Sequence, residues 1–237
     1  MVVLRRDTYD EMCRSAADLI AEEIRRKPNA VLGLATGSSP LGVYRHLIEL
    51  YREGKVDFSC VRTVNLDEYC GLPKDHPESY ARFMRENFFG QINIDPHNTF
   101  IPNGMAEDPD AECARYDHLI GWLGGIDLQL LGIGFNGHIG FNEPSDCFIE
   151  ETHRVRLTQS TLIANARFFP GGVPPANAYT VGMKTILGAK SVLLIAGEEK
   201  YRIVKRAFTG EITPRVPASI LQTHSHATVI YVGEEEL

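Results

Sequence analysis

The sequence predicts an α/β protein with an open, mainly parallel β-sheet that is flanked by helices on both faces. Two observations predict it: short apolar runs recur along the chain, and segments with helical spacing of apolar residues separate them. Several runs are apolar at consecutive positions, which is typical of strands covered on both faces. Strands that alternate with helices indicate βαβ units. We therefore expect a three-layer, Rossmann-like architecture.

Five short apolar segments are the predicted strands, in addition to one at the start of the chain. They are Val31–Ala35, Val61–Leu66, Leu128–Ile133, Val192–Ala196 and Thr228–Val232. In a parallel sheet the carboxyl ends of the strands lie along one edge, and ligands bind in the crevice beyond it. The residues after each strand are therefore the candidates for an active site.

Helices are predicted between the strands from apolar stripes and start signals. The segment Thr8–Arg26 carries one stripe, and Asp7 is its predicted N-cap. The segment Pro40–Glu53 carries a second stripe. Its predicted cap is Ser39, and Pro40 is its predicted first helical residue, where a missing N–H costs nothing.

A third helix is predicted to start at Asp108-Pro109 and to run towards Trp122. The segment 148–172 has a weak pattern, and the sequence leaves open whether it forms a lid over a ligand. We find no internal repeat, low-complexity tract or convincing linker. The sequence therefore predicts one domain over residues 1–237.

Composition argues against several classes of protein. The 237 residues carry a net charge of −7, which argues against a general nucleic-acid binder but not against a locally held phosphate. The five cysteines are scattered and odd in number, which indicates reduced thiols rather than a disulfide framework. We find neither a signal peptide nor a segment long enough to cross a bilayer, so we expect a cytoplasmic protein with no nucleic-acid or membrane partner.

The first candidate site follows the first of the five listed strands. It is the run Thr36-Gly37-Ser38-Ser39-Pro40, which leads into a predicted helix. Glycine lets the backbone approach a ligand closely, and hydroxyls with free N–H groups at a helix start form an anion site. The dinucleotide and nucleotide motifs are absent. Phosphate binding and a plain capped turn explain this segment equally well.

The second candidate site follows the strand that ends at Leu66. Here Asp67-Glu68-Tyr69 places carboxylates where the cleft is expected, and Asp67 could act as a general base. Taken alone, a solvated loop acid is the favoured interpretation of this residue.

The most informative stretch is the eleven-residue run Gly134–Pro144, which follows the third of the listed strands. It combines three glycines with Asn136, His138, a second asparagine and Glu143. Histidine is the side chain best matched to proton transfer near neutral pH, and a nearby carboxylate can orient and stabilise its charged form. The density of polar groups after an apolar strand favours a site over a simple glycine-rich turn.

Two cations and one histidine pair remain. Arg167 could bind phosphate bidentately and Lys200 could bind it as a point charge, although each is an ordinary surface charge when taken in isolation. His224 and His226 suggest a metal site, but no further ligand lies at suitable spacing. We therefore expect no metal.

Four segments together resemble the glucosamine-6-phosphate deaminase family. They are Thr36–Pro40, Asn65–Tyr69, Asn136–Pro144 and Ala166–Phe169. They occur in the family's order and spacing, the resemblance covers essentially the whole chain, and the run G-H-I-G-F-N-E-P is highly specific. The resemblance implies isomerisation with deamination, in which glucosamine 6-phosphate and water give fructose 6-phosphate and ammonia without a metal or organic cofactor.

The resemblance also implies a role for each site residue. His138 would open the pyranose ring, and Glu143 would hold and charge-balance its imidazole. Asp67 would take the proton from C2 and return it at C1. The residues that would hold the substrate through its phosphate are Thr36, Gly37, Ser38, Ser39, Arg167 and Lys200.

The sequence departs from the best-known family pattern in two places. Some members carry aspartate where this chain has Asn136, which can orient His138 but cannot stabilise its charge. We therefore predict heavier reliance on Glu143. The stretch 150–156 and the end at Leu237 match the hexameric, allosterically activated members poorly. We expect no activation by N-acetylglucosamine 6-phosphate, and a monomer or small homo-oligomer.

Two alternative functions belong to different classes. A 6-phosphogluconolactonase resembles this family in its glycine–histidine loop, but typically has aspartate before G-H and lacks F-N-E-P. Asn136 and the run Phe141–Pro144 favour the deaminase instead. A non-catalytic sugar-phosphate sensor could lose its proton-transfer groups, whereas this chain keeps Asp67, His138 and Glu143.

Overall fold

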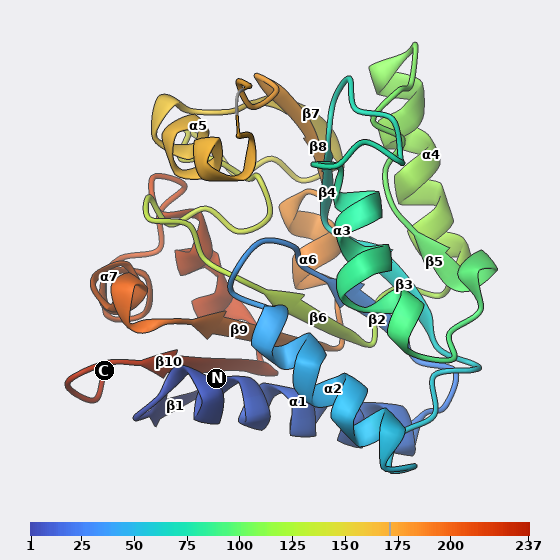
Figure 1. Ribbon diagram of the computed structural model, residues 1–237. Helices are drawn as coiled ribbons and strands as arrows, with labels where there is room; N and C mark the ends of the chain where they lie inside the picture. Colours follow the sequence, from blue (N-terminus) through green and yellow to red (C-terminus); the bar gives the residue numbers. More distant parts are fainter. Residues whose placement is uncertain (171) are drawn as a thin grey trace.

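The computed structural model describes residues 1–170 and 172–237, and a seven-stranded sheet lies at its centre (Figure 1). The strand order is β1-β10-β9-β6-β2-β3-β5, and all neighbouring strands are parallel. This confirms the predicted fold class. The strands are β1 (Val2–Arg6), β2 (Val31–Leu34), β3 (Arg62–Asn65), β5 (Thr99–Phe100), β6 (Leu128–Leu131), β9 (Ser191–Ala196) and β10 (Ala227–Val232).

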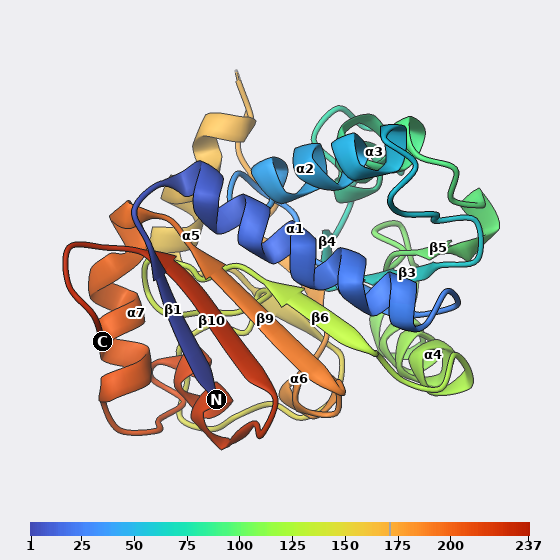
Figure 2. The same ribbon diagram turned by 90° about the horizontal axis from the view of Figure 1, so that it is seen from below.

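Helices cover both faces of this sheet, because successive residues of a strand point to opposite faces. Leu130 packs in one apolar cluster with α1, α2 and α3, and its neighbour Leu131 packs in another with α4, α6 and α7. Figure 2 shows α1 lying across the strands. The helices are α1 (Tyr9–Arg26), α2 (Leu41–Arg52), α3 (Tyr80–Asn87), α4 (Pro109–Trp122), α5 (Gln159–Asn165), α6 (Met183–Leu187) and α7 (Tyr201–Thr209).

In the described residues, five short 3₁₀ helices join these elements. They are η1 (Phe89–Gln91), η2 (Pro96–Asn98), η3 (Ala166–Phe168), η4 (Glu198–Lys200) and η5 (Pro217–Thr223). Across the described ranges, no helix is both long enough and apolar enough to span a membrane.

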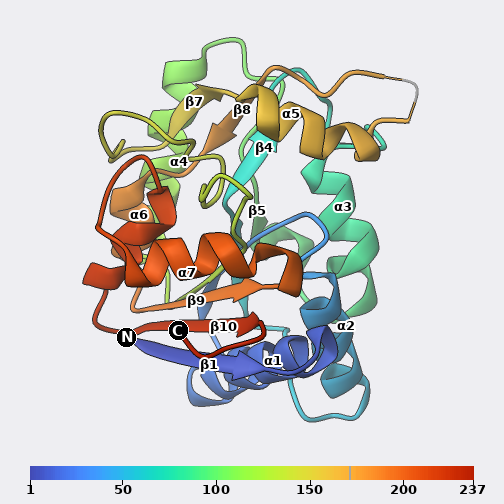
Figure 3. The same cartoon turned by 90° about the vertical axis from the view of Figure 1, so that its left-hand side faces the viewer.

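A second, three-stranded antiparallel sheet was not predicted from the sequence. Its order is β4-β8-β7, with bounds β4 (Asp67–Tyr69), β8 (Asn177–Thr180) and β7 (His153–Arg156). Figures 1 and 3 both show it beside α5, on the side of the main sheet away from α1. Because β4 follows β3 after one residue, Leu66, Asp67 is the first residue of the small sheet. The segment 148–172, whose pattern is weak, contains β7 and α5.

Two helix starts differ from the prediction. The N-cap of α1 is Thr8 rather than Asp7, because Thr8 and Glu11 form a reciprocal capping box. Helix α2 begins at Leu41 with Pro40 as its N-cap and has no side-chain cap, so Ser39 does not cap it. The third start is confirmed, since Asp108 caps α4 and Pro109 is its first residue.

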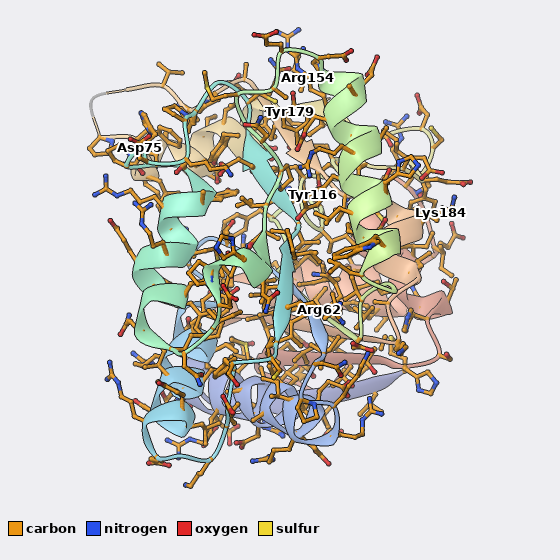
Figure 4. All side chains as sticks on the ribbon, turned by 90° about the vertical axis from the view of Figure 1, so that its right-hand side faces the viewer. Arg62, Asp75, Tyr116, Arg154, Tyr179 and Lys184 are labelled. Atoms are coloured by element: carbon orange, nitrogen blue, oxygen red, sulfur yellow. The ribbon has the colours of Figure 1, made fainter. Side chains whose placement is uncertain are left out.

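Tyr116 of α4 fixes the strand ends that lead to the second candidate site. Figure 4 labels Tyr116, which lies between α4 and β3. Its hydroxyl donates to the carbonyl of Asn65 at 2.7 Å and lies 3.2 Å from the carbonyl of Phe100. Asn65 is the last residue of β3, two positions before Asp67. The main sheet and helix α4 therefore both help to fix the position of Asp67.

Candidate active site

The segments that follow β2, β3, β6 and β9 meet in one cleft of about 360 Å³. Its lining includes Thr36–Ser39, Asp67, His138 and Lys200, and α3, α5 and η3 add further walls. The cleft therefore forms at the carboxyl ends of the strands, as expected, and its residues are far apart in the sequence.

Asp67 is a buried carboxylate that faces this cleft. Its exposed fraction is 6%. Burial raises the pKa of Asp67 to about 8, the nearby carboxylate of Glu68 adds to the rise, and the Thr36 hydroxyl opposes it. A carboxyl group that titrates near the working pH is suited to take up and return a proton. The solvated loop acid, favoured by the sequence pattern alone, does not describe this residue.

Glu68, which the sequence analysis did not single out, points away from the cleft into the start of α3. Its carboxylate accepts backbone N–H bonds from Tyr69, Tyr80 and Ala81 at 2.8, 3.0 and 2.9 Å. Burial raises the pKa of Glu68 to about 7 although these bonds oppose the rise. Glu68 therefore fixes α3 against β4 and keeps a second acid beside Asp67.

His138 lies in a tight loop that requires glycine. The Gly134 N–H donates to the His138 carbonyl at 2.9 Å, which closes the loop. A Cβ on Gly134 would lie 2.2 Å from the imidazole ring, so only glycine leaves room for it. Gly137 has a φ of +88°, which other residues rarely adopt. The ring therefore has a single well-defined position at the cleft wall.

Glu143 lies behind His138, outside the cleft lining. Its Oε2 is 3.5 Å from His138 Nδ1, a contact that becomes ionic when the imidazole is protonated and that leaves Nε2 for a ligand in the cleft. Burial alone would raise the pKa of Glu143, but the contact with His138 and hydrogen bonds from Thr161 and Thr158 lower it to about 2. Glu143 is therefore a fixed negative charge beside the imidazole.

The hydrogen bonds of Asn136 go to Glu143 and to the backbone of His138 rather than to the imidazole ring. Its Nδ2 donates to Glu143 Oε2 at 2.8 Å, and its Oδ1 accepts the backbone N–H of His138 at 3.2 Å. The expectation that Asn136 orients His138 by hydrogen bonding thus holds for the backbone of His138, while the ring is oriented through Glu143.

The other end of the cleft is cationic and partly exposed. Arg167 Nη2 donates to Ser38 Oγ at 3.1 Å, and its guanidinium lies 4.7 Å from the centroid of the Phe168 ring. Lys200 Nζ lies 2.8 Å from the centroid of the Phe135 ring. Burial lowers the pKa of Lys200 to about 8, the nearby Glu199 carboxylate opposes the shift, and Arg167 adds to it. Two cations at one end of the cleft make it a candidate anion site.

The loop between β2 and α2 supports this anion site. Gly37 has a φ of +89°, which turns the chain towards the cleft. Tyr9 of α1 holds the loop from behind, since its hydroxyl lies 3.2 Å from the Ser38 carbonyl and 3.0 Å from the Ser39 carbonyl. No local signal in the sequence links Tyr9 to this loop, which is 29 residues away.

The histidine pair near the carboxyl end is structural. His224 is buried, its Nε2 lies 2.9 Å from the Ala189 carbonyl, and its Nδ1 accepts the backbone N–H of His226 at 3.2 Å. Within the part of the chain that the structure describes, no group of three or more His, Cys, Asp or Glu side chains could hold a metal ion.

Comparison with known proteins shows the family to which this chain belongs. Residues 5–230 match the profile of the family described as glucosamine-6-phosphate isomerases/6-phosphogluconolactonase, and the chain belongs to this family.

Within the family the chain is similar to deaminases. It is 54% identical to a glucosamine-6-phosphate deaminase of Lachnoclostridium phytofermentans over 232 residues, which are 97% of this chain and 98% of the relative. A solved structure of a monomeric glucosamine-6-phosphate deaminase is 47% identical, with a TM-score of 0.95 over 98% of this chain and 97% of the other.

Similarity to the lactonase branch is more distant. A 6-phosphogluconolactonase of Thermotoga maritima is 19% identical, with a TM-score of 0.76 over 98% of this chain and 99% of the other. At this level of identity the comparison shows a shared fold alone. The comparisons thus confirm the resemblance on which the sequence-based function rests.

Proposed function

We propose that the chain converts glucosamine 6-phosphate and water to fructose 6-phosphate and ammonia. One observation carries the proposal. Asp67, a buried carboxyl group of raised pKa, and His138, an imidazole beside the Glu143 carboxylate, line the same cleft. The deaminase relatives support the same reaction. Below, Asp67, His138 and Glu143 are the proton-transfer end of the cleft, and Thr36–Ser39, Arg167 and Lys200 are the phosphate end.

Ring opening is the step that suits His138. Its Nε2 takes the proton from the anomeric hydroxyl and delivers one to the ring oxygen, so that the C1–O5 bond breaks and an open-chain aldehyde forms. The imidazole is charged between these transfers, and Glu143, 3.5 Å from Nδ1, stabilises that charge. No net proton is gained or lost in this step.

Asp67 suits the movement of a proton between carbon atoms. Its carboxylate takes the proton from C2 while a water molecule gives one to the C1 oxygen, which produces an enolamine and hydroxide. Return of the Asp67 proton at C1 gives an iminium ion at C2, and loss of one proton to the hydroxide leaves an imine. Water then adds to C2, ammonia leaves, and the ketone of fructose 6-phosphate remains. Because Asp67 is only 6% exposed, bulk water competes poorly for the proton it carries.

The phosphate end supplies orientation. Arg167 and Lys200 bind the 6-phosphate, and Ser38 offers a hydroxyl beside Arg167. Binding energy from this non-reacting group positions C1 and C2 against the proton-transfer end.

Two substrates test this proposal against its rival. The purified protein is given glucosamine 6-phosphate or 6-phosphogluconolactone, and ammonia, fructose 6-phosphate and lactone consumption are followed. We expect equal amounts of ammonia and fructose 6-phosphate, and no lactone hydrolysis above the uncatalysed rate. Lactone hydrolysis without ammonia release would establish the rival. Ligand-induced thermal stabilisation without turnover of either compound would indicate a sensor.

We also propose that residues 1–237 act as one domain, as a monomer without activation by N-acetylglucosamine 6-phosphate. The cleft takes residues from most of the chain, and the monomeric deaminase covers 98% of it. A hyperbolic rate curve that the acetylated sugar leaves unchanged is the expected result, and a sigmoidal curve that it makes hyperbolic would contradict it.

The five free cysteines support a reducing, cytoplasmic location.

A further inference from the structure

Thr158 contacts the proton-transfer end although it lies outside the cleft lining. Its backbone N–H and its hydroxyl Oγ1 each donate to Glu143 Oε1 at 3.1 Å. The same Oγ1 is the N-cap of α5, since it accepts the backbone N–H of Thr161 at 3.4 Å. One side chain therefore joins the start of a helix to the carboxylate behind His138.

The N-cap hydrogen bond limits the groups to which the Thr158 hydroxyl can donate. The Thr161 N–H occupies a lone pair of Oγ1, which leaves the O–H free to donate. Ser160 Oγ at 3.0 Å and Thr161 Oγ1 at 3.1 Å are neutral acceptors, whereas Glu143 carries a negative charge. A carboxylate is the strongest acceptor in reach, so the O–H points at Glu143.

The two oxygens of Glu143 have separate partners, and the nearby Thr161 hydroxyl also helps to lower the pKa of this carboxylate. Oε1 accepts both bonds from Thr158, while Oε2 accepts from Asn136 at 2.8 Å and faces His138 Nδ1 at 3.5 Å. The contact with His138 is the longest of these four. Because that contact is long, its alignment depends on the bonds that hold the rest of the carboxylate.

Helix α5 also forms a wall of the cleft. Thr161, Ala164 and Asn165 line it, and Arg167 follows in η3. Asn165 Nδ2 donates to the Tyr69 hydroxyl at 2.9 Å, which ties the far end of the helix to β4. Helix α5 is therefore held at its far end by β4, independently of the cap at Thr158.

We propose that Thr158 is a positioning residue for ring opening: it aligns Glu143 with His138 while it also caps α5. The inference rests on the proposed function. It assigns to Thr158 an effect on proton transfer by His138, separate from the binding of phosphate and from the work of Asp67.

The test uses Thr158→Val, which removes the hydroxyl, and Thr158→Ser, which keeps it. Thr158→Asp is a third variant, because aspartate caps a helix well but cannot donate to Glu143 when ionised. Asp108→Ala removes the side-chain cap of α4, which is not part of the cleft lining, and serves as the control for loss of a helix cap. Thermal unfolding of each variant shows whether it is folded.

Two activities are measured. The first is kcat and KM for ammonia release from glucosamine 6-phosphate. The second is exchange between the α and β anomers of glucosamine 6-phosphate, followed by NMR in an Asp67→Asn background. Anomer exchange needs ring opening but not proton transfer at C2, so it reports on His138 and Glu143 alone.

We expect Thr158→Val and Thr158→Asp to lower kcat and anomer exchange by the same factor, about tenfold or more, with KM within about threefold of the wild type. Thr158→Ser and Asp108→Ala should keep both activities within about threefold. Unchanged anomer exchange in folded Thr158→Val or Thr158→Asp would overturn the inference, as would an equal loss in Thr158→Ser. Absence of ammonia release from the wild-type protein would instead reject the proposed function.

Discussion

The two ends of the cleft differ in exposure, charge and support. At the phosphate end Arg167 is exposed, and the cations lie against the rings of Phe168 and Phe135. At the proton-transfer end Asp67 is buried, and the side chain of Glu143 is 6% exposed. The first end presents positive charge to a ligand, permanent on Arg167 and titrating near pH 8 on Lys200, whereas the second holds the groups proposed to move protons.

This difference shows how one cleft separates binding from chemistry. A flexible, partly hydrated cation can follow a phosphate as it enters, and its loss weakens binding. A buried acid has a displaced pKa only because solvent is kept away from it. Substitutions at the two ends should therefore change different kinetic constants, and the following predictions test that separation.

The largest effect is expected for Asp67→Asn. Because asparagine cannot take a proton from C2, kcat for ammonia release should fall by about a thousandfold or more, with KM little changed. Steady-state assays of ammonia and fructose 6-phosphate measure both constants. The thermal midpoint should not fall, since Asp67 is already neutral at pH 7 in the empty cleft. A large rise in KM at unchanged kcat would place Asp67 in binding instead.

Glu143→Gln should have the second largest effect. Glutamine keeps the shape of the side chain but removes the charge that stabilises the imidazolium, and Asn136 is neutral and cannot replace it. We expect kcat to fall by about a hundredfold. Anomer exchange of glucosamine 6-phosphate measures the affected step directly. If ring opening stayed at the wild-type rate, the predicted reliance on Glu143 would be wrong.

Arg167→Lys should act mainly on KM. Lysine keeps the charge but loses the planar fork and the stacking on Phe168, so KM should rise by about tenfold while kcat changes by less than about threefold. Steady-state kinetics over a wide substrate range separates the two constants. A loss confined to kcat would contradict the division between the ends.

The smallest effect concerns the pH dependence of kcat/KM. Asp67 must lose its proton to act as a base, so kcat/KM should rise with pH up to about 8. Lys200 loses its charge as pH rises through about 8, so phosphate binding should weaken above that value. Lys200→Arg keeps its charge at high pH and should retain several-fold more kcat/KM than the wild type at pH 9.5, relative to pH 7.5. Profiles with identical alkaline limbs would exclude Lys200 as the titrating group.

The strands and the place of the cleft could be predicted because they depend on local patterns. Strands such as β9 are covered on both faces and therefore appear as continuous apolar runs. The residues after such strands include Asp67, His138 and Lys200, which the structure brings to one cleft. Position along the chain is enough here, since parallel strands end at the same edge.

The missed features depend on partners that are distant in the sequence. Strands β4 and β7 are short and rich in charged residues, and their pairing with β8 gives them their structure. The N-cap of α1 is a different kind of miss, because Thr8 and Glu11 form the local T-x-x-E pattern of a capping box, which the sequence itself shows. The support of Glu143 by Thr158, 15 residues away, has no periodic signal.

The most direct test of the separation between binding and chemistry is a calorimetric titration of glucosamine 6-phosphate into the Asp67→Asn protein at pH 7. Asparagine is nearly the same size as the neutral aspartic acid that burial favours at this pH. We predict that the catalytically dead protein binds the substrate with a dissociation constant within about threefold of the wild-type KM, if chemistry is slow relative to substrate release. Loss of binding by a hundredfold or more would contradict the account, because Asp67 would then be holding the substrate rather than moving its proton.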